Sequence, residues 1–209
     1  MIGIIDYGMG NLFSVSKALE RLGVPYKMGD RPEKIGDCDG YILPGVGAFP
    51  DAMKALDEHG FIPFIKQKAA DDVPIYGICL GMQLLFESSE EGGETKGLGL
   101  FPGRIVKFPG VNPKGQNYKV PHMGWNKLKI HQPSQLLLTD VGEEYVYFVH
   151  SFVAQTDDDS ILYATADYHL DVPAIIGKEN LVASQFHPEK SGRPGMQLLE
   201  NFCKVMVKQ

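Results

Sequence analysis

The sequence predicts an α/β fold with a mostly parallel central sheet flanked by helices and additional antiparallel strands in the C-terminal half. In residues 1–87, short apolar runs alternate with segments whose apolar residues recur at helical spacing, as is typical of parallel strands joined by helices. In residues 104–185, short β-like stretches follow one another, separated by turn-rich segments. No linker or repeat divides the two halves, so we expect one domain spanning residues 1–209.

The first expected strand is the apolar run at residues 2–5. A helix follows at residues 11–22, where Leu12, Val15 and Leu19 recur at helical spacing and Gly23 supplies the stop. Further strands are expected at residues 24–28, 41–43 and 73–78, and further helices at residues 51–56, 61–69 and 80–87.

The expected strands of the C-terminal half are short and lack helices between them. They lie at residues 105–108, 144–149, 161–166, 174–177 and 181–185. A final helix is expected at residues 196–207, where Leu199, Phe202, Val205 and Met206 form one apolar face.

Composition excludes several classes of protein. The 209 residues carry 20 basic and 26 acidic side chains, a net charge of −6, which argues against a general nucleic-acid binder. Three cysteines without CxxC spacing argue against a disulfide framework or a zinc site and favour a reducing compartment. No apolar run approaches the roughly 18 residues of a membrane helix, and the N-terminus lacks the pattern of a signal peptide. We therefore expect a cytoplasmic protein without a metal site.

Two glycine-containing loops follow predicted strands. Gly8-Met9-Gly10 lacks the third glycine of a dinucleotide-binding fingerprint, because Phe13 occupies that position, and a tight turn is expected instead. Pro44-Gly45-Val46-Gly47 lacks the lysine and hydroxyl residue of a P-loop. Its glycines let the backbone approach a ligand and present N–H groups, so this loop can form half of an oxyanion hole.

The strongest local signal is Gly77-Ile78-Cys79-Leu80-Gly81, which matches G-x-S-x-G with cysteine in place of serine. It lies between a predicted strand and a predicted helix, as a nucleophile elbow requires. The sharp turn raises the sulfur of Cys79 above the sheet and leaves little room for side chains at Gly77 and Gly81. The start of the helix favours a thiolate, and the N–H of Leu80 would point toward a developing oxyanion.

The alternative for Cys79 is a buried core cysteine in a chance match to the motif. Such a structural role is expected for Cys38, in a polar turn, and for Cys203, within the last helix. His122 and His150 lie in apolar and aromatic surroundings, where a structural role is again the default.

His187 is the candidate proton carrier for the thiol. It follows a predicted strand, and Pro188 holds it in an extended conformation. Glu189 lies two positions on, where an extended backbone directs both side chains to the same side. Its carboxylate can bind one imidazole nitrogen and leave the other facing the sulfur, so the sequence indicates a Cys–His–Glu triad.

Taken in order, these motifs resemble class I, or triad-type, glutamine amidotransferases, and more closely the glutaminase subunits of imidazole glycerol phosphate synthase. The elbow and His187-Pro188-Glu189 belong to the whole class. The subfamily is indicated by Asp6-Tyr7-Gly8-Met9-Gly10-Asn11, Pro44-Gly45-Val46-Gly47-Ala48-Phe49 and Pro121-His122-Met123-Gly124-Trp125-Asn126. The resemblance spans nearly the whole chain and implies a single type-1 glutamine amidotransferase domain with no cofactor.

The resemblance implies a defined reaction. Cys79 attacks the side-chain amide of glutamine to form a γ-glutamyl thioester, while His187, oriented by Glu189, protonates the departing ammonia and then activates water. The oxyanion would be held by the N–H of Leu80 and by one from Val46 or Gly47, and a peptide flip in residues 44–47 can switch that site. The positions that match the family's glutamine-binding residues are Gly45, Gly47, Gln83, Glu91, Ser151 and Phe152.

The resemblance also implies a partner. The family pairs this subunit in a heterodimer with a (β/α)8-barrel cyclase subunit, which uses the ammonia to make imidazole glycerol phosphate and aminoimidazole carboxamide ribonucleotide in histidine biosynthesis. The glutaminase of the family is nearly silent until the partner binds its nucleotide. The positions that match the interface are Asn11, His122, Met123, Trp125, Tyr147 and Lys190. Neither a nucleic-acid nor a membrane partner is expected.

Three alternatives remain open from the sequence. A glutaminase serving a different synthase would share the triad but should lack the motif at residues 121–126. A cysteine hydrolase acting alone on γ-glutamyl compounds should turn over without a partner. A catalytically silent scaffold for the barrel is disfavoured by the intact Cys79, His187 and Glu189.

Overall fold

The computed structural model describes residues 1–207, so the last two residues of the expected domain lie outside the described part of the chain. Its strands are β1 (Ile2–Ile5), β2 (Tyr26–Gly29), β3 (Gly40–Gly45), β4 (Ile75–Cys79), β5 (Phe86–Ser89), β6 (Thr95–Lys96), β7 (Phe101–Lys107), β8 (His122–Ile130), β9 (Tyr145–His150), β10 (Phe152–Gln155), β11 (Leu162–Asp167), β12 (Asp171–Lys178) and β13 (Leu181–Ser184). Its α-helices are α1 (Leu12–Arg21), α2 (Pro32–Ile35), α3 (Phe49–Glu58), α4 (Phe61–Ala70), α5 (Leu80–Leu84) and α6 (Gly192–Asn201). Short 3₁₀ segments are η1 (Leu136–Leu138), η2 (Asp159–Ile161) and η3 (Pro188–Lys190), and a π-helical segment, η4 (Phe202–Met206), extends α6.

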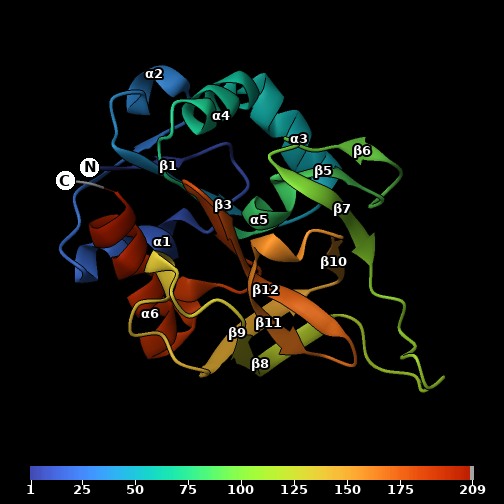
Figure 1. The fold of residues 1–209 in the computed structure, drawn as a ribbon. Helices are drawn as coiled ribbons and strands as arrows, with labels where there is room; N and C mark the ends of the chain where they lie inside the picture. Colours follow the sequence, from blue (N-terminus) through green and yellow to red (C-terminus); the bar gives the residue numbers. More distant parts are fainter. Residues whose placement is uncertain (208–209) are drawn as a thin grey trace.

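The centre of the molecule is a large sheet with the strand order β2-β1-β3-β4-β13-β12-β11-β8-β9 (Figure 1). The strands from β2 to β13 in this order pair in parallel. Beyond β13, the strands from β12 to β9 pair antiparallel. A smaller sheet, β10-β7-β5-β6, packs beside α3 and α5. The predicted fold class is confirmed.

Helices cover both faces of the sheet, because its central strands bury both sets of alternating side chains. Ile42 of β3 packs in a cluster with residues of α1 and α6, whereas its neighbours Tyr41 and Leu43 pack with residues of α3 and α4. Figure 1 shows α1 and α6 on one side of the parallel strands and α3 and α4 on the other. Helix α1 begins after Asn11, whose side chain accepts the backbone N–H of Ser14 as an N-cap.

The helix expected at residues 80–87 is wrong in its second half. Helix α5 ends at Leu84, and the chain continues almost directly into β5, which pairs with β7. Phe86 is fully buried there, with its ring centroid 5.9 Å from that of Phe101. The apolar run at residues 84–86 suits a helix or a strand, and the pairing with a segment farther along the chain decides between them.

Other departures from the prediction also arise from pairing between distant segments. Strand β3 continues through Pro44 to Gly45, because both residues pair with β4. Strand β8, the longest, was not predicted at all, since few of its residues are buried and it contains Gly124 and Asn126. Its register against β9 places His122 opposite His150.

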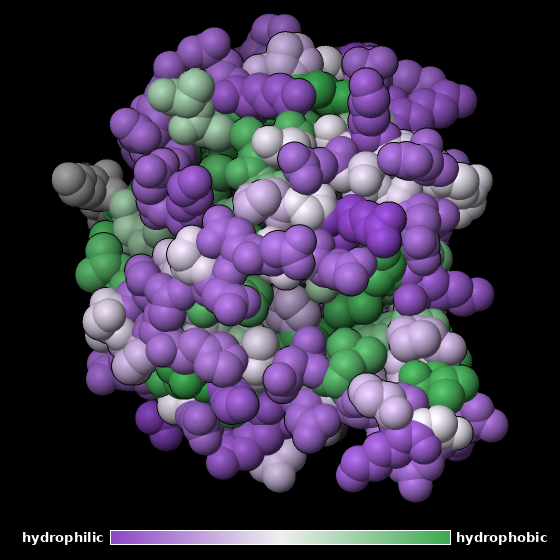
Figure 2. All heavy atoms as spheres, turned by 45° about the vertical axis from the view of Figure 1, so that its right-hand side comes forward, coloured by the Kyte–Doolittle hydropathy of each residue, from purple (hydrophilic) through white to green (hydrophobic). Residues whose placement is uncertain are grey.

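The described helices include none long and apolar enough to cross a membrane. The face drawn in Figure 2 is dominated by hydrophilic residues, with several hydrophobic ones emerging between them. The parallel part of the sheet places the carboxyl ends of β3, β4 and β13 at one edge, which is where open α/β sheets form their ligand sites.

Candidate active site

Cys79 ends β4 in a strained turn. Its backbone φ is 55° and its ψ is −111°, a conformation that side-chain-bearing residues adopt at cost and that is typical of a nucleophile elbow. A Cβ atom at Gly81 would lie 1.9 Å from the carbonyl oxygen of Leu43, and one at Gly77 would lie 2.8 Å from the carbonyl oxygen of Gly81. Only glycine fits at either position, so the two glycines allow the close approach that raises Cys79 at the sheet edge.

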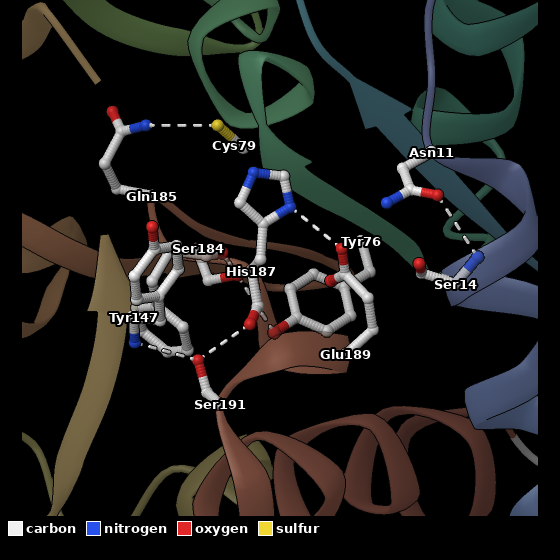
Figure 3. A network of polar contacts seen from close by, with 11 residues as sticks. Asn11, Ser14, Tyr76, Cys79, Tyr147, Ser184, Gln185, His187, Glu189 and Ser191 are labelled. Atoms are coloured by element: carbon white, nitrogen blue, oxygen red, sulfur yellow. Dashed lines mark hydrogen bonds and ion pairs between the residues drawn. The ribbon is translucent and has the colours of Figure 1, made fainter. Parts of the chain in front are cut away.

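His187 lies between Cys79 and Glu189 (Figure 3). Its Nδ1 atom is 2.8 Å from Oε1 of Glu189, and both side chains are buried. His187 is extended as predicted, with φ −91° and ψ 102°. The expectation that an extended backbone aligns the two side chains is wrong, because residues 188–190 form the 3₁₀ turn η3, and this turn brings the carboxylate back to the ring.

The electrostatics of His187 favour the imidazolium. Burial alone would lower the pKa of His187, but its hydrogen bonds to Cys79 and Glu189 outweigh this and raise the pKa to about 9. The charged ring carries a proton on both nitrogens, so its Nε2 can give a proton to a leaving group. Behind the elbow, burial raises the pKa of the Tyr7 phenol, which remains a neutral donor to the carbonyl of Pro44 at 2.9 Å.

Ser191 fixes the segment that carries His187, a role the sequence analysis missed. Its Oγ donates to the carbonyl of His187 at 2.7 Å and accepts the N–H of Tyr147 at 3.0 Å (Figure 3). The side chain is fully buried. Ser191 therefore ties the triad segment to β9, and its burial between two elements far apart in sequence leaves no local signal.

A cavity of about 390 Å³ opens at this edge. It brings together most of the predicted site residues from separate parts of the chain. Its lining comprises Val46, Gly47, Cys79, Leu80, Gln83, Glu91, Pro121, Val149, His150, Ser151, Phe152, His187 and Lys190. Gly45 does not line it: it is buried in β3, where a Cβ would lie 2.7 Å from the hydroxyl of Tyr7. Gly45 thus serves packing, not direct contact with a ligand in the cavity.

One of the oxyanion donors expected in the loop at residues 44–47 is already bonded within the protein. The N–H of Val46 donates to the carbonyl of Met9 at 3.0 Å, so it is not available to the cavity in this arrangement. Gly47 has a φ of 104°, a conformation that favours glycine. The N–H of Leu80 opens α5, and the first N–H groups of a helix have no partner within it.

The side chains of Gln83 and Glu91 are each partly used in hydrogen bonds within the protein. The Nε2 of Gln83 donates to the carbonyl of Phe152 at 3.2 Å and to Oε1 of Gln185 at 3.0 Å. Because both amide hydrogens are used, its own oxygen is the group left for the cavity. One oxygen of Glu91 accepts the N–H of Phe49 at 2.8 Å, at the start of α3.

Gln185 is a second residue that the sequence analysis missed. It is fully buried, and its Nε2 lies 3.9 Å from the sulfur of Cys79. A sequence signal existed: a glutamine stands two positions before His187 at the end of an apolar strand. Cys38 and Cys203 are buried outside the cavity, as their expected structural roles require.

The predicted interface residues fall into two groups. The side chains of Met123 and Trp125 are 64% and 57% exposed, Lys190 is exposed, and the Trp125 ring meets that of Tyr147 at a centroid distance of 5.9 Å. Asn11 is half-buried as the cap of α1.

His122 does not fit a surface role. It is 2% exposed, and its ring stacks between those of Phe148 and Tyr168 at centroid distances of 4.5 and 3.9 Å. Its place in the interior corrects the expectation of a direct contact with another chain.

Sequence comparisons identify close relatives of the chain. The family model described as glutamine amidotransferase class-I matches residues 3–206. The chain is 56% identical to the imidazole glycerol phosphate synthase subunit HisH of Halalkalibacterium halodurans, covering 100% of this chain and 97% of that protein. It is 50% identical to the protein of the same name from Bacillus subtilis, covering 100% and 98%.

Solved structures share the fold at low sequence identity. A crystal structure of a glutamine amidotransferase superposes with a TM-score of 0.73 at 20% identity, covering 96% of this chain and 97% of that one. The structure of PurLQS from Thermotoga maritima gives 0.74 at 18% identity, covering 96% of each chain. The chain thus belongs to the class-I glutamine amidotransferase family and, within it, to the HisH subunits of imidazole glycerol phosphate synthase, which are glutamine amidotransferases of histidine biosynthesis.

Proposed function

We propose that the chain hydrolyses glutamine to glutamate and ammonia with Cys79 as nucleophile, His187 as general acid and base, and Glu189 as the group that orients His187. One observation carries the proposal. The strained elbow places Cys79 beside a histidine whose other ring nitrogen is bonded to a buried carboxylate, all at the end of one cavity. This is the arrangement that activates a thiol for acyl transfer.

The reaction proceeds in two halves. The sulfur of Cys79 attacks the side-chain carbonyl carbon of glutamine, and His187 gives its Nε2 proton to the leaving nitrogen, so that ammonia departs and a γ-glutamyl thioester remains. His187 then takes a proton from water, whose oxygen attacks the thioester carbonyl. Glutamate leaves, and the sulfur returns to its starting state. Glu189 stabilises the imidazolium through both halves.

The oxyanion formed in each half needs N–H donors. Leu80 supplies one from the start of α5. A second requires a change in the loop, because the N–H of Val46 is engaged by the carbonyl of Met9. Rotation of the peptide between Gly45 and Val46 would release it toward the cavity, which Val46 and Gly47 line. Resting activity is therefore low until this loop rearranges.

Glutamine itself would be held by the walls of the cavity. The free oxygen of Gln83 and the carboxylate of Glu91 suit the ammonium group of the substrate, because both are acceptors. The backbone N–H groups of residues 151 and 152 suit its α-carboxylate, and Gly47 leaves room beside them. Gly45 supports this wall by packing.

The partner we propose is a separate (β/α)8-barrel cyclase subunit that receives the ammonia in a heterodimer. The names of the relatives describe them as subunits of imidazole glycerol phosphate synthase, which implies a second chain. Met123 and Trp125 are exposed and of the residue types enriched at interface cores, and exposed Lys190 lines the cavity. We place the protein in the cytoplasm, as a single domain over the described chain.

Assays of glutamine hydrolysis with and without the cyclase and its nucleotide test the function. We expect slow hydrolysis by the chain alone, strong stimulation by the loaded partner, and loss of activity in Cys79→Ala. Activity that survives Cys79→Ala would overturn the mechanism. Full activity without a partner would favour a cysteine hydrolase that acts alone.

A further inference from the structure

Gln185 reaches the sulfur of Cys79 although it does not line the cavity. Its side chain is fully buried, and its Nε2 lies 3.9 Å from the sulfur (Figure 3). Its Oε1 accepts the amide of Gln83. We propose that Gln185 is a positioning residue, held by a chain of hydrogen bonds so that its N–H group faces the sulfur of Cys79. This inference rests on the proposed role of Cys79 as nucleophile.

The direction of the Gln185 amide is determined by the carbonyl of Phe152. A backbone carbonyl can only accept, so the group that Gln83 turns toward it must be the NH₂. The second hydrogen of that NH₂ goes to Gln185, which must therefore present its oxygen to Gln83. The NH₂ of Gln185 is then left to face the sulfur.

Buried His150 also bonds the carbonyl of Phe152, and buried His122 lies behind His150. The Nδ1 of His150 lies 2.7 Å from the oxygen of Phe152, so it carries the proton and donates. Burial lowers the pKa of His150 to about 3 and that of His122 to about 4, so both rings are neutral near pH 7. The Nε2 of His150 must then accept, and it lies 2.9 Å from Nδ1 of His122.

This series of hydrogen bonds ends at β8. The Nε2 of His122 accepts from Nδ2 of Asn126 at 3.4 Å, and the same Nδ2 donates to the carbonyl of Asp167 at 2.7 Å. The carbonyls of Phe152 and Asp167 thus determine which atom donates and which accepts in each hydrogen bond from Asn126 to Gln185. A network in which no member can turn over is rigid, and it fixes the one donor that reaches the sulfur.

The sulfur faces few other polar groups on the described chain. His187 lies against it from the segment after β13, with Glu189 behind, and Tyr7 lies near it from the segment after β1. Glu91, Lys190 and His150 line the same cavity. The donors of Tyr7 and His150 are used by the carbonyls of Pro44 and Phe152, whereas the amide of Gln185 is directed at the sulfur. A donor on a sulfur anion stabilises it and limits its rotation, so that the thiolate stays aligned for attack.

The test uses alkylation of Cys79 in the full chain by iodoacetamide, followed by mass spectrometry of the peptide that contains it. This reaction needs the sulfur but not bound glutamine. We expect Gln185→Met, which keeps the size but removes the donor, to slow alkylation at pH 7 by about tenfold, together with a comparable fall in glutamine turnover. Gln185→Asn, which keeps an amide but shortens it, should show the same loss and serves if the first variant does not fold.

A matched control separates positioning from stability. Asn201 is also a buried amide, and it donates to the carbonyls of Leu137 and Thr139 far from the cavity. Asn201→Leu should lower the thermal midpoint and leave the alkylation rate at the wild-type value. Alkylation of Gln185→Met at the wild-type rate would overturn the inference, whereas turnover by Cys79→Ala would overturn the proposed function instead.

A double-mutant cycle tests the series of hydrogen bonds behind Gln185. We expect His150→Leu to slow alkylation by about threefold in the otherwise unchanged chain and to have no effect when Gln185→Met is already present. Equal effects in both backgrounds would show that His150 acts on the sulfur independently, and the chain as drawn would be wrong.

Discussion

The Nδ1 atom of His187 lies 2.8 Å from Oε1 of Glu189, across a single 3₁₀ turn, while the other carboxylate oxygen is buried without a hydrogen-bond partner among residues 1–207. A carboxylate normally shares its charge among several donors. Here the carboxylate of Glu189 is bonded to the ring of His187, so its negative charge acts mainly on that ring. Burial alone would lower the pKa of His187, but Cys79 and Glu189 together outweigh burial and raise it.

The first prediction concerns the pH dependence of stability. The pKa of His187 is raised to about 9, so the native state holds the proton more tightly than the unfolded chain. This stabilisation is complete below about pH 6.5 and is lost as the pH rises through about 9. We expect the free energy of unfolding in urea to fall between pH 7 and pH 9.5, and to fall less in Glu189→Gln. Equal slopes in the two proteins would contradict the assignment.

Glu189→Gln should also reduce turnover. The amide keeps the size of the side chain but not the charge that stabilises the imidazolium, so we expect kcat to fall by about a hundredfold or more. Steady-state kinetics with the cyclase partner present measure this. Unchanged kcat would mean that Glu189 has no part in orienting or charging His187.

The two buried histidines His122 and His150 should affect the pH dependence of stability in the opposite direction from His187. The pKa values of His122 and His150 are lowered to about 4 and about 3 by burial, so the unfolded chain binds protons more tightly than the native state. Their contribution is present above about pH 6.5 and is lost as the pH falls toward these values, by about 2 kcal/mol for each ring at pH 5. In His122→Phe, the drop in unfolding free energy from pH 7 to pH 5 should be smaller by about that amount; a drop as large as in the wild type counts against neutral burial.

Gly81 should tolerate no side chain. A Cβ there would lie 1.9 Å from the carbonyl oxygen of Leu43, so Gly81→Ala must push β3 and α5 apart. We expect a loss of about 3 kcal/mol in unfolding free energy and loss of turnover. The control is Gly142→Ala, where the nearest atoms lie 3.8 Å away. Similar stability of both variants would refute the tight elbow.

Gly47 tests the loop. Its φ of 104° favours glycine, and a Cβ would meet the side chain of Met9 at 2.8 Å. Gly47→Val should block the rearrangement that releases the N–H of Val46 and so reduce partner-stimulated hydrolysis by about tenfold or more. Gly23→Val places similar strain, at a φ of 66°, far from the cavity, and should leave stimulation intact. If Gly47→Val keeps normal stimulation, the loop is not the switch.

Trp125 tests the proposed partner surface. Its side chain is 57% exposed, so Trp125→Ala should leave the stability of the chain alone nearly unchanged and weaken cyclase binding by about 2 kcal/mol in calorimetric titration. Leu136 is equally exposed at 57% and belongs to η1, so Leu136→Ala is the matched control. Loss of binding in neither variant would place the interface elsewhere.

Local patterns predicted much of the fold and part of the site. The positions of β1, β4 and α1 follow from short-range spacing and from glycine stops. The elbow around Cys79 was predictable because the steric demand at Gly77 and Gly81 is itself a sequence pattern.

What the sequence could not predict depends on contacts between distant segments. The pairing of His122 with His150 follows from the register of β8 against β9, and the buried position of Gln185 depends on Gln83. The engagement of the Val46 N–H depends on a carbonyl that the chain reaches only after folding. Strand β5 replaces the second half of a predicted helix for the same reason. Its pairing partner β7 lies farther along the chain, and the residues of β5 alone do not indicate it.

The strand β13 has a parallel neighbour on one side and an antiparallel neighbour on the other. The elbow lies on the parallel side, and the exposed residues of β8 lie at the far end of the antiparallel side. The two sides are nevertheless linked, because Ser191 ties the triad segment to β9 and a chain of hydrogen bonds runs from β8 to Gln185 beside the sulfur. Exposed positions of β8 such as Met123 and Trp125 can therefore be redesigned for a new partner surface, provided that the buried residues His122 and His150 between that surface and the elbow are kept.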